Sequence, residues 1–161
     1  MSARTRTFSW DDPLAMARAI EDLSGLERMR QVIAGALPHP PIARMMDIRM
    51  VEASEGRVVF EATPSEFHYN PIGVVHGGFA ATMLDSAMGC AVHTKLPARV
   101  GYTTLELKLN FVRAVTLATG PVHAIGTVLH AGRTTALAEG RLESADGTLL
   151  AHATTTCLIL R

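Results

Sequence analysis

The sequence predicts an α+β domain in which one curved antiparallel sheet wraps around a single long helix. Residues 77–92 form a helix-like apolar stretch, rich in Ala and Met, in which Asp85 is the only charged residue. Two strand-like segments precede this stretch and four follow it, separated by short turns. A helix that is apolar on all sides is enclosed by its surroundings, and a curved sheet provides that enclosure.

The first forty residues are expected to form a helical extension. Asp12-Pro13 is typical of a helix start, with Asp as the cap and Pro in the first turn. Ser24 and Glu27 match a capping box, which divides the region into two helices. The apolar residues recur at intervals of three and four: Met16, Ile20, Leu23, Leu26, Met29, Ile33 and Leu37. We expect residues 1–40 to pack on a domain of residues 41–161, or on a neighbouring subunit.

Segments in which apolar and polar residues alternate, bounded by turn residues, predict the strands. After a short turn at 42–46, strands are expected at 47–53 and 57–63, with a hairpin turn at Glu55-Gly56. A loop at 64–75 leads to the helix at 78–94. The next strand has a polar face that includes Thr104 and an opposite, apolar face made of Leu105, Leu107, Leu109 and Phe111. Strands at 122–130, 134–143 and 149–160 complete a sheet whose edge invites pairing with a second copy.

Composition excludes several classes of protein. The 161 residues fit one domain, and 48% hydrophobic with 19% charged residues indicate a globular chain. Fifteen basic and fifteen acidic residues cancel, so neither nucleic acid nor a membrane surface is expected as a partner. No secretory signal or membrane-spanning run is visible. Cys90 and Cys157 lie far apart, which favours reduced thiols and a cytoplasmic location.

A candidate active site lies around the apolar helix. An unpaired carboxylate such as that of Asp85 is costly to bury, so it is either paired or faces a cavity where its charge is used. His76-Gly77-Gly78 stands where the helix begins, and free amides at a helix N-terminus attract developing negative charge. Structural explanations remain open: Asp85 pairing with an arginine, and the Gly pair permitting close packing. The spacing of His68, His76 and Asp85 suits no compact metal site, so no metal is expected.

These residues resemble those of the hotdog-fold thioesterases, specifically the PaaI-like branch that hydrolyses acyl- and aryl-CoA thioesters. The similarity spans roughly residues 41–160 and leaves the N-terminal extension outside. It is carried by these motifs: Asn70-Pro71, Gly73, His76-Gly77-Gly78, Asp85, the strand from Thr104 to Phe111, and the Asp146-Gly147 turn. The resemblance implies a hotdog fold and a homodimer, with a dimer of dimers expected.

The resemblance also implies roles for individual residues. Asp85 would activate water or attack the thioester carbonyl, and the Gly77 amide would polarise the carbonyl oxygen. Asn70 would orient substrate or water, and His76 would serve in positioning. Thr104, with Thr103 as the alternative, would hold the water beside the carboxylate. Each site would form between subunits, with the Asn and Gly from one chain and the Asp from the other.

Thioester chemistry agrees with these implied roles. Hydrolysis builds negative charge on the carbonyl oxygen, which a fixed backbone amide stabilises. Since a thiolate leaves readily, no strong general acid and no cofactor are expected, coenzyme A being part of the substrate. Because coenzyme A carries phosphates, we expect basic side chains at the mouth of the pocket. Arg113 and Arg133 are the candidates, with Gly78 as a further substrate contact.

The leading hypothesis is an acyl-CoA thioesterase for medium-chain or aromatic acyl groups. An acyl-thioester hydratase or dehydratase is the first alternative, since the fold can serve that chemistry. His68-Tyr69 is similar to the catalytic histidine segment of fatty-acid dehydratases, although Asn70 stands at that segment's proline position. A non-catalytic protein that binds acyl-CoA is the second alternative.

Overall fold

The computed structural model describes residues 3–161. Its elements are α1 (Pro13–Ala19), α2 (Gly25–Ile33), α3 (Pro41–Met46), β1 (Ile48–Ser54), β2 (Arg57–Ala62), η1 (Glu66–His68), α4 (Gly77–His93), β3 (Gly101–Phe111), η2 (Leu117–Thr119), β4 (Val122–Ala131), β5 (Thr135–Ser144) and β6 (Leu149–Leu160). The symbols η1 and η2 denote short 3₁₀ helices.

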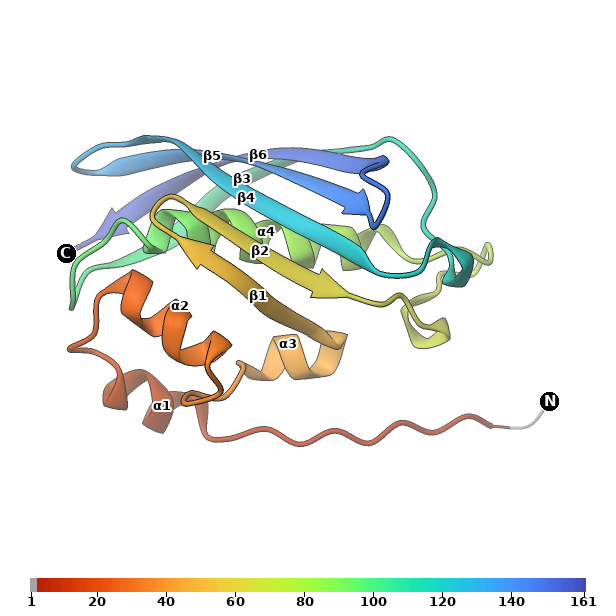
Figure 1. The fold of residues 1–161 in the computed structure, drawn as a ribbon, viewed down its shortest axis with the longest axis horizontal. Coiled ribbons are helices and arrows are strands. Elements are labelled where there is room, and N and C mark those ends of the chain that lie inside the picture. Colours follow the sequence, from red (N-terminus) through yellow and green to blue (C-terminus); the bar gives the residue numbers. More distant parts are fainter. Residues whose placement is uncertain (1–2) are drawn as a thin grey trace.

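The strands form one antiparallel sheet in the order β1-β2-β4-β5-β6-β3, so β1 and β3 are its edges. Figure 1 shows α4 lying along the sheet, with α1, α2 and α3 gathered near β1. Helix α2 contacts both β1 and α4. The predicted α+β arrangement, a sheet around one long helix, is confirmed.

The N-terminal helices begin where the capping residues predict. Asp12 accepts hydrogen bonds from the backbone N–H groups of Leu14 (2.9 Å) and Ala15, and Ser24 and Glu27 form the expected capping box of α2. These side chains satisfy amides that a helix start leaves without partners. The turn expected at 42–46 is instead the short helix α3. The domain boundary at residue 40 stays a prediction.

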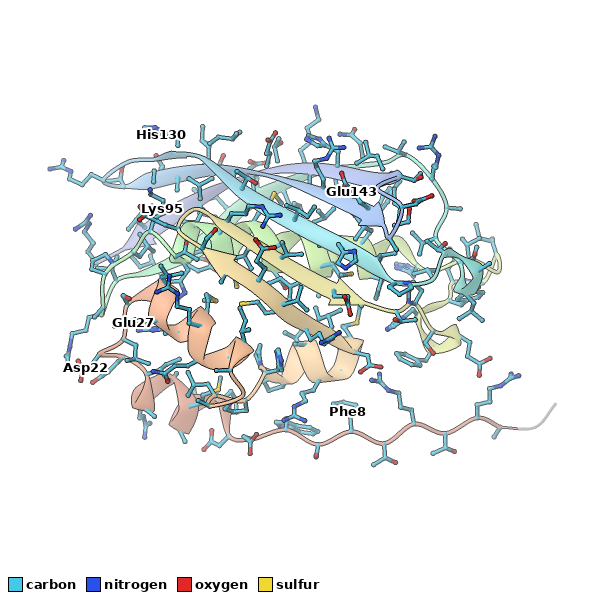
Figure 2. All side chains as sticks on the ribbon, in the orientation of Figure 1. Phe8, Asp22, Glu27, Lys95, His130 and Glu143 are labelled. Carbon is cyan, nitrogen blue, oxygen red and sulfur yellow. The ribbon has the colours of Figure 1, made fainter. Side chains whose placement is uncertain are left out.

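Small residues on the sheet let α4 pack closely against it. Met83, Leu84 and Met88 of α4 are fully buried, and the core also contains the short side chains of Ala136 and Ala138 in β5. Side chains fill the space between the helix and the sheet (Figure 2). Because α4 is buried on most of its circumference, its low amphipathicity is explained by enclosure.

Gly126 of β4 marks a close approach between the sheet and the backbone of α4. A Cβ atom at this position would lie 2.3 Å from the backbone carbonyl of Ala87, which cannot move aside like a flexible side chain. We expect Gly126→Ala to lower the free energy of unfolding by about 2 kcal/mol or more, because overpacking forces the backbone to shift. Gly101→Ala is the control, since its Cβ would make only an ordinary contact, 3.9 Å from Leu160. Chemical denaturation of both variants measures the difference; equal stabilities would contradict the close contact.

The side chains of β3 do not follow the expected simple alternation. The pairing register of β3 with β6 shifts between Thr104 and Glu106, so Leu105 is an extra residue that forms a β-bulge. A bulge re-aims the side chains that flank it. Leu105 is therefore 56% exposed, whereas Leu107 packs on the core. The prediction that Leu105 faces the core and Thr104 the opposite side is wrong, because Thr104 points toward α4.

Candidate functional site

Asp85 and Thr104 meet between α4 and the edge strand β3. The Thr104 hydroxyl donates a hydrogen bond of 2.9 Å to Oδ1 of Asp85, which is half-buried. Within the described part of the chain, no ion pair includes Asp85. Pairing with an arginine therefore does not account for this carboxylate.

A cavity of about 320 Å³ lies beside Asp85 and Thr104. Its walls come from α2, α3, α4 and strands β1 to β3, and they are largely apolar, with Met29, Met50 and Phe60 among the lining residues. Carboxylates in apolar clefts are candidates for catalysis because loss of hydration makes them better bases and nucleophiles. The second expectation for Asp85, that it faces a cavity, is confirmed.

Three other titratable side chains that line this cavity, those of Cys90, Tyr102 and His93, are uncharged at neutral pH. Desolvation raises the pKa of the Cys90 thiol to about 12, so the thiolate that nucleophilic chemistry needs is not formed. Desolvation also raises the pKa of Tyr102 well above its usual value. It lowers the pKa of His93 to about 4, with a smaller contribution from the Arg28 charge, so the imidazole is neutral. Among these groups, Asp85 is the candidate base or nucleophile.

The start of α4 offers one backbone N–H without an acceptor. His76 is the N-cap, and its Nδ1 accepts a hydrogen bond of 2.8 Å from the Gly78 N–H. The Phe79 N–H donates to the His76 carbonyl. Among the described residues, the Gly77 N–H alone of these three amides has no protein acceptor. The Gly78 N–H is already bound to the capping side chain of His76. The Gly77 N–H is therefore the group that can donate a hydrogen bond to a substrate.

A second pocket, of about 330 Å³, adjoins this helix start. His76, Gly77, Phe111 and Arg113 are among its lining residues. The Phe111 ring packs against Gly77, so closely that a Cβ atom added to Gly77 would lie 2.7 Å from the ring. Arg113 donates a hydrogen bond to the carbonyl of Leu149, and its side chain is exposed. The structure thus places one of the two arginine candidates beside Gly77.

Asn70 and His68 hold the loop before α4. The carboxamide oxygen of Asn70 accepts hydrogen bonds from the N–H groups of Ile72 (3.1 Å) and Val74 (3.3 Å), as in an Asx turn. His68 is buried, and its Nδ1 accepts from the Ser65 N–H at 3.0 Å. Its Nε2 therefore carries the proton and donates to the Met46 carbonyl. Both ring nitrogens of His68 are occupied, and desolvation lowers its pKa.

The two halves of the candidate site are not brought together within one chain. Gly77 and Asp85 are eight positions apart on α4, which corresponds to about 12 Å along the helix axis. Arg133 lies between β4 and β5, outside the two pockets that contain Asp85 and Gly77. Sequence reasoning missed Tyr102 and the cavity walls contributed by the N-terminal helices. The apolar stripe of α2 indicates in the sequence that one face of this helix is buried. It does not indicate which part of the domain that face packs against.

Residues 3–161 provide neither a cluster of metal ligands nor a helix that could cross a membrane. No group of three or more His, Cys, Asp and Glu side chains there could hold a metal ion. No helix in that range is long and apolar enough to cross a membrane. Both cysteines are free thiols.

Comparison with known proteins gives a consistent assignment. Residues 72–151 match the family model of the thioesterase superfamily. The chain is 33% identical over 120 residues to the "Putative esterase SSO2140" of Saccharolobus solfataricus, covering 74% of this chain and 84% of that protein.

Solved structures share the fold. The PaaI protein of the E. coli phenylacetic acid degradation operon has a TM-score of 0.74 at 17% identity, over 86% of this chain and 97% of its own. The smu.793 protein of Streptococcus mutans, solved with acetyl CoA, has a TM-score of 0.64 at 24% identity, over 70% of this chain and 87% of its own. These similarities confirm the predicted hotdog fold.

Proposed function

The chain belongs to the thioesterase superfamily and is a thioester hydrolase, and from this premise we propose that it hydrolyses acyl-CoA thioesters with medium-chain or aromatic acyl groups. One observation carries the proposal: Asp85, hydrogen-bonded by Thr104, borders a largely apolar cavity and takes part in none of the ion pairs of the described residues. Such a cavity suits an apolar acyl group, and the carboxylate at its wall can reach the thioester carbon. The acetyl CoA complex of smu.793 supports coenzyme A as the carrier.

In the proposed reaction, Asp85 acts as general base or as nucleophile. As a base it takes a proton from water while the water oxygen bonds to the carbonyl carbon. The C–S bond then breaks, and the thiolate of coenzyme A leaves and takes the proton that Asp85 had accepted. If Asp85 is the nucleophile, its attack expels the thiolate and forms a mixed anhydride, which water then cleaves to the free acid and the Asp85 carboxylate. The Thr104 hydroxyl fixes the orientation of the carboxylate through its hydrogen bond to Oδ1. The Gly77 N–H binds the carbonyl oxygen as negative charge develops on it.

The separation of Gly77 from Asp85 supports a site shared between two chains. In such a reaction the hydrogen-bond donor lies about 3 Å from the oxyanion, and the base lies about 3 Å from the water oxygen whose proton it takes. A gap of about 12 Å along the helix axis is too long for both groups of one chain to act on one carbonyl. We therefore propose a homodimer in which Gly77 of one chain and Asp85 of the other act together. Association of two such dimers stays a prediction.

The edge strand β3 supports the geometry of that dimer. It offers an unpaired edge of eleven residues and exposes Leu105 and Phe111, features that favour pairing with another strand. Antiparallel pairing of β3 with its own copy about the middle of the strand would set the Phe111 end beside the Gly101 end of the copy. Phe111 packs on Gly77 and Thr104 holds Asp85, so this pairing would bring the two halves of the site toward each other.

The remaining predicted residues have proposed supporting roles. Arg113, beside the Gly77 pocket, would contact the phosphates of coenzyme A. Asn70 uses its carboxamide oxygen to hold its own loop, so a contact with substrate or water would come from its amide nitrogen. His76 positions the helix start through its cap. Arg133 lies outside both pockets of its own chain, so it could contact coenzyme A only at the site that it shares with the second chain.

The dehydratase alternative is disfavoured by His68. A catalytic base needs a free ring nitrogen, whereas both nitrogens of His68 are engaged with backbone groups. His93, at the C-terminal end of α4, lies two helical turns from Asp85, too far for these two groups of one chain to act together on adjacent substrate atoms.

Thiol release against a panel of acyl-CoAs tests the proposed function. Short, medium, long and aromatic acyl-CoAs, together with a 3-hydroxyacyl-CoA from which loss of water would give an enoyl-thioester, are incubated with the protein, and free thiol and enoyl-thioester absorbance are followed together. We expect thiol release, fastest with medium-chain or aromatic substrates, and no enoyl-thioester. Enoyl-thioester without thiol would favour the dehydratase. Tight binding without thiol release across the panel would favour a binding protein.

A further inference from the structure

The N-terminal extension supplies a substantial part of the lining of the cavity beside Asp85. Half of its lining residues lie between residues 20 and 43: Ile20 at the end of α1 and seven others in α2, the segment after it and α3. Met29 is the largest buried apolar side chain that this region contributes, being 7% exposed and part of the main hydrophobic core. The opposite wall is the face of α4 that carries Asp85, Ser86 and Cys90. The extension is therefore one wall of the cavity.

This wall is held in a fixed position against the C-terminal end of α4. The Gly25 N–H donates to the carbonyl of Leu96 (3.1 Å), and the Arg99 N–H donates to the carbonyl of Glu21 (3.0 Å). Arg99 also forms an ion pair with Asp22, which Figure 2 labels at the α1–α2 connection. A Cβ at Gly25 would lie 1.8 Å from the His93 carbonyl oxygen, so α2 touches the backbone of α4 directly.

The interior of the cavity suits an uncharged group. Met29 faces a chamber that also contains Met50 and Phe60, both nearly inaccessible to solvent. The guanidinium of Arg28, the one arginine among the lining residues, is engaged by the carbonyls of Leu23 and Glu21. A second carboxylate in the chamber would be repelled by Asp85 and would lose its hydration without compensation.

Resting on the proposed function, we infer that α2 and residues 38–43 form the closing wall of the acyl chamber, and that Met29 sets the length of the acyl group. The chamber of about 320 Å³ is small for a ligand site. It suits a short or medium, uncharged acyl chain or a single ring. A longer chain meets α2, whose position is fixed by its contacts with α4.

Substitution of Met29 tests this assignment. The measured quantity is the ratio of kcat/KM for dodecanoyl-CoA to that for hexanoyl-CoA. Met29→Ala removes most of the side chain from the wall and is expected to raise this ratio about tenfold or more, because methylene groups that fit or clash change discrimination by such factors. Val32→Phe, a second lining position, is expected to lower it. Ile33→Ala is the matched control, since Ile33 lies on the same helix outside the cavity; its ratio should equal that of the wild type.

A binding measurement separates this inference from the proposed reaction. The dissociation constants of hexyl-CoA and dodecyl-CoA, thioethers that cannot be hydrolysed, are measured for the same variants. A shift toward the longer ligand in Met29→Ala supports the wall even if no thiol is ever released, a result that would overturn only the hydrolase proposal. Unchanged ratios and unchanged binding preference in both Met29→Ala and Val32→Phe would overturn the wall. If circular dichroism shows that Met29→Ala is unfolded, the kcat/KM ratio and the binding preference of Val32→Phe alone decide whether α2 forms the wall.

Discussion

Asp85→Asn is expected to lower kcat for acyl-CoA hydrolysis by about 10³-fold or more while the fold stays intact. The carboxamide keeps the volume of the side chain and can still accept the hydrogen bond from Thr104. It can neither take a proton from water nor attack the carbonyl, and loss of a base or nucleophile costs roughly 10²–10⁴-fold or more. Thiol release with saturating substrate measures the effect, and circular dichroism checks the fold.

Ser86→Ala is the control for that variant. Ser86 is the next residue of α4 and lines the same cavity, so the substitution disturbs the same surroundings without touching the carboxylate. Its kcat is expected to stay within about threefold of the wild type, because the Ser86 hydroxyl is given no part in the proton transfer or the attack on the carbonyl. An Asp85→Asn enzyme with a rate close to that of Ser86→Ala would show that the carboxylate is not the reacting group.

Gly77→Pro is expected to lower kcat by roughly 10²–10³-fold, the usual cost of removing one oxyanion donor. Proline lacks the N–H but is well suited to the first position of a helix. The preceding residue, His76, has φ −62° and ψ 138°, the extended conformation that a following proline requires. The substitution therefore removes the donor and keeps the helix start.

Gly77→Ala is the matched control for the added atoms. Alanine brings the same Cβ toward the Phe111 ring, which lies within 2.7 Å of that position and must shift in both variants. It retains the N–H, so its kcat should stay within about tenfold of the wild type if the donor is what matters. Equal losses in the two variants would assign the effect to crowding against Phe111 and would remove Gly77 from the proposed mechanism.

The helix starts and the enclosed helix could be predicted from the sequence because they depend on local chemistry. Asp12 and the Ser24–Glu27 pair are capping signals that act within three residues. The apolar character of α4 indicates a helix enclosed by a sheet. The same local logic identified Asp85 as a charge in need of a cavity, and the cavity is there.

Long-range geometry accounts for what the sequence did not predict. The bulge at Leu105 depends on the register between β3 and β6, which lie about fifty residues apart in the chain. No local pattern reports such a register, so the direction of Thr104 could not be predicted. The wall formed by Met29 depends likewise on where α2 docks, and its helical stripe shows only that one face is buried.

Complementation between two inactive chains tests the shared site most directly. Asp85→Asn and Gly77→Pro chains, carrying different tags, are produced together, and dimers that contain one of each are purified by both tags. In a two-fold dimer with sites between subunits, one of the two sites combines an intact Gly77 with an intact Asp85, so about half of the wild-type activity should return. If mixed dimers form but stay as inactive as the two parents, both groups act within one chain, and the account of a site shared between subunits is wrong.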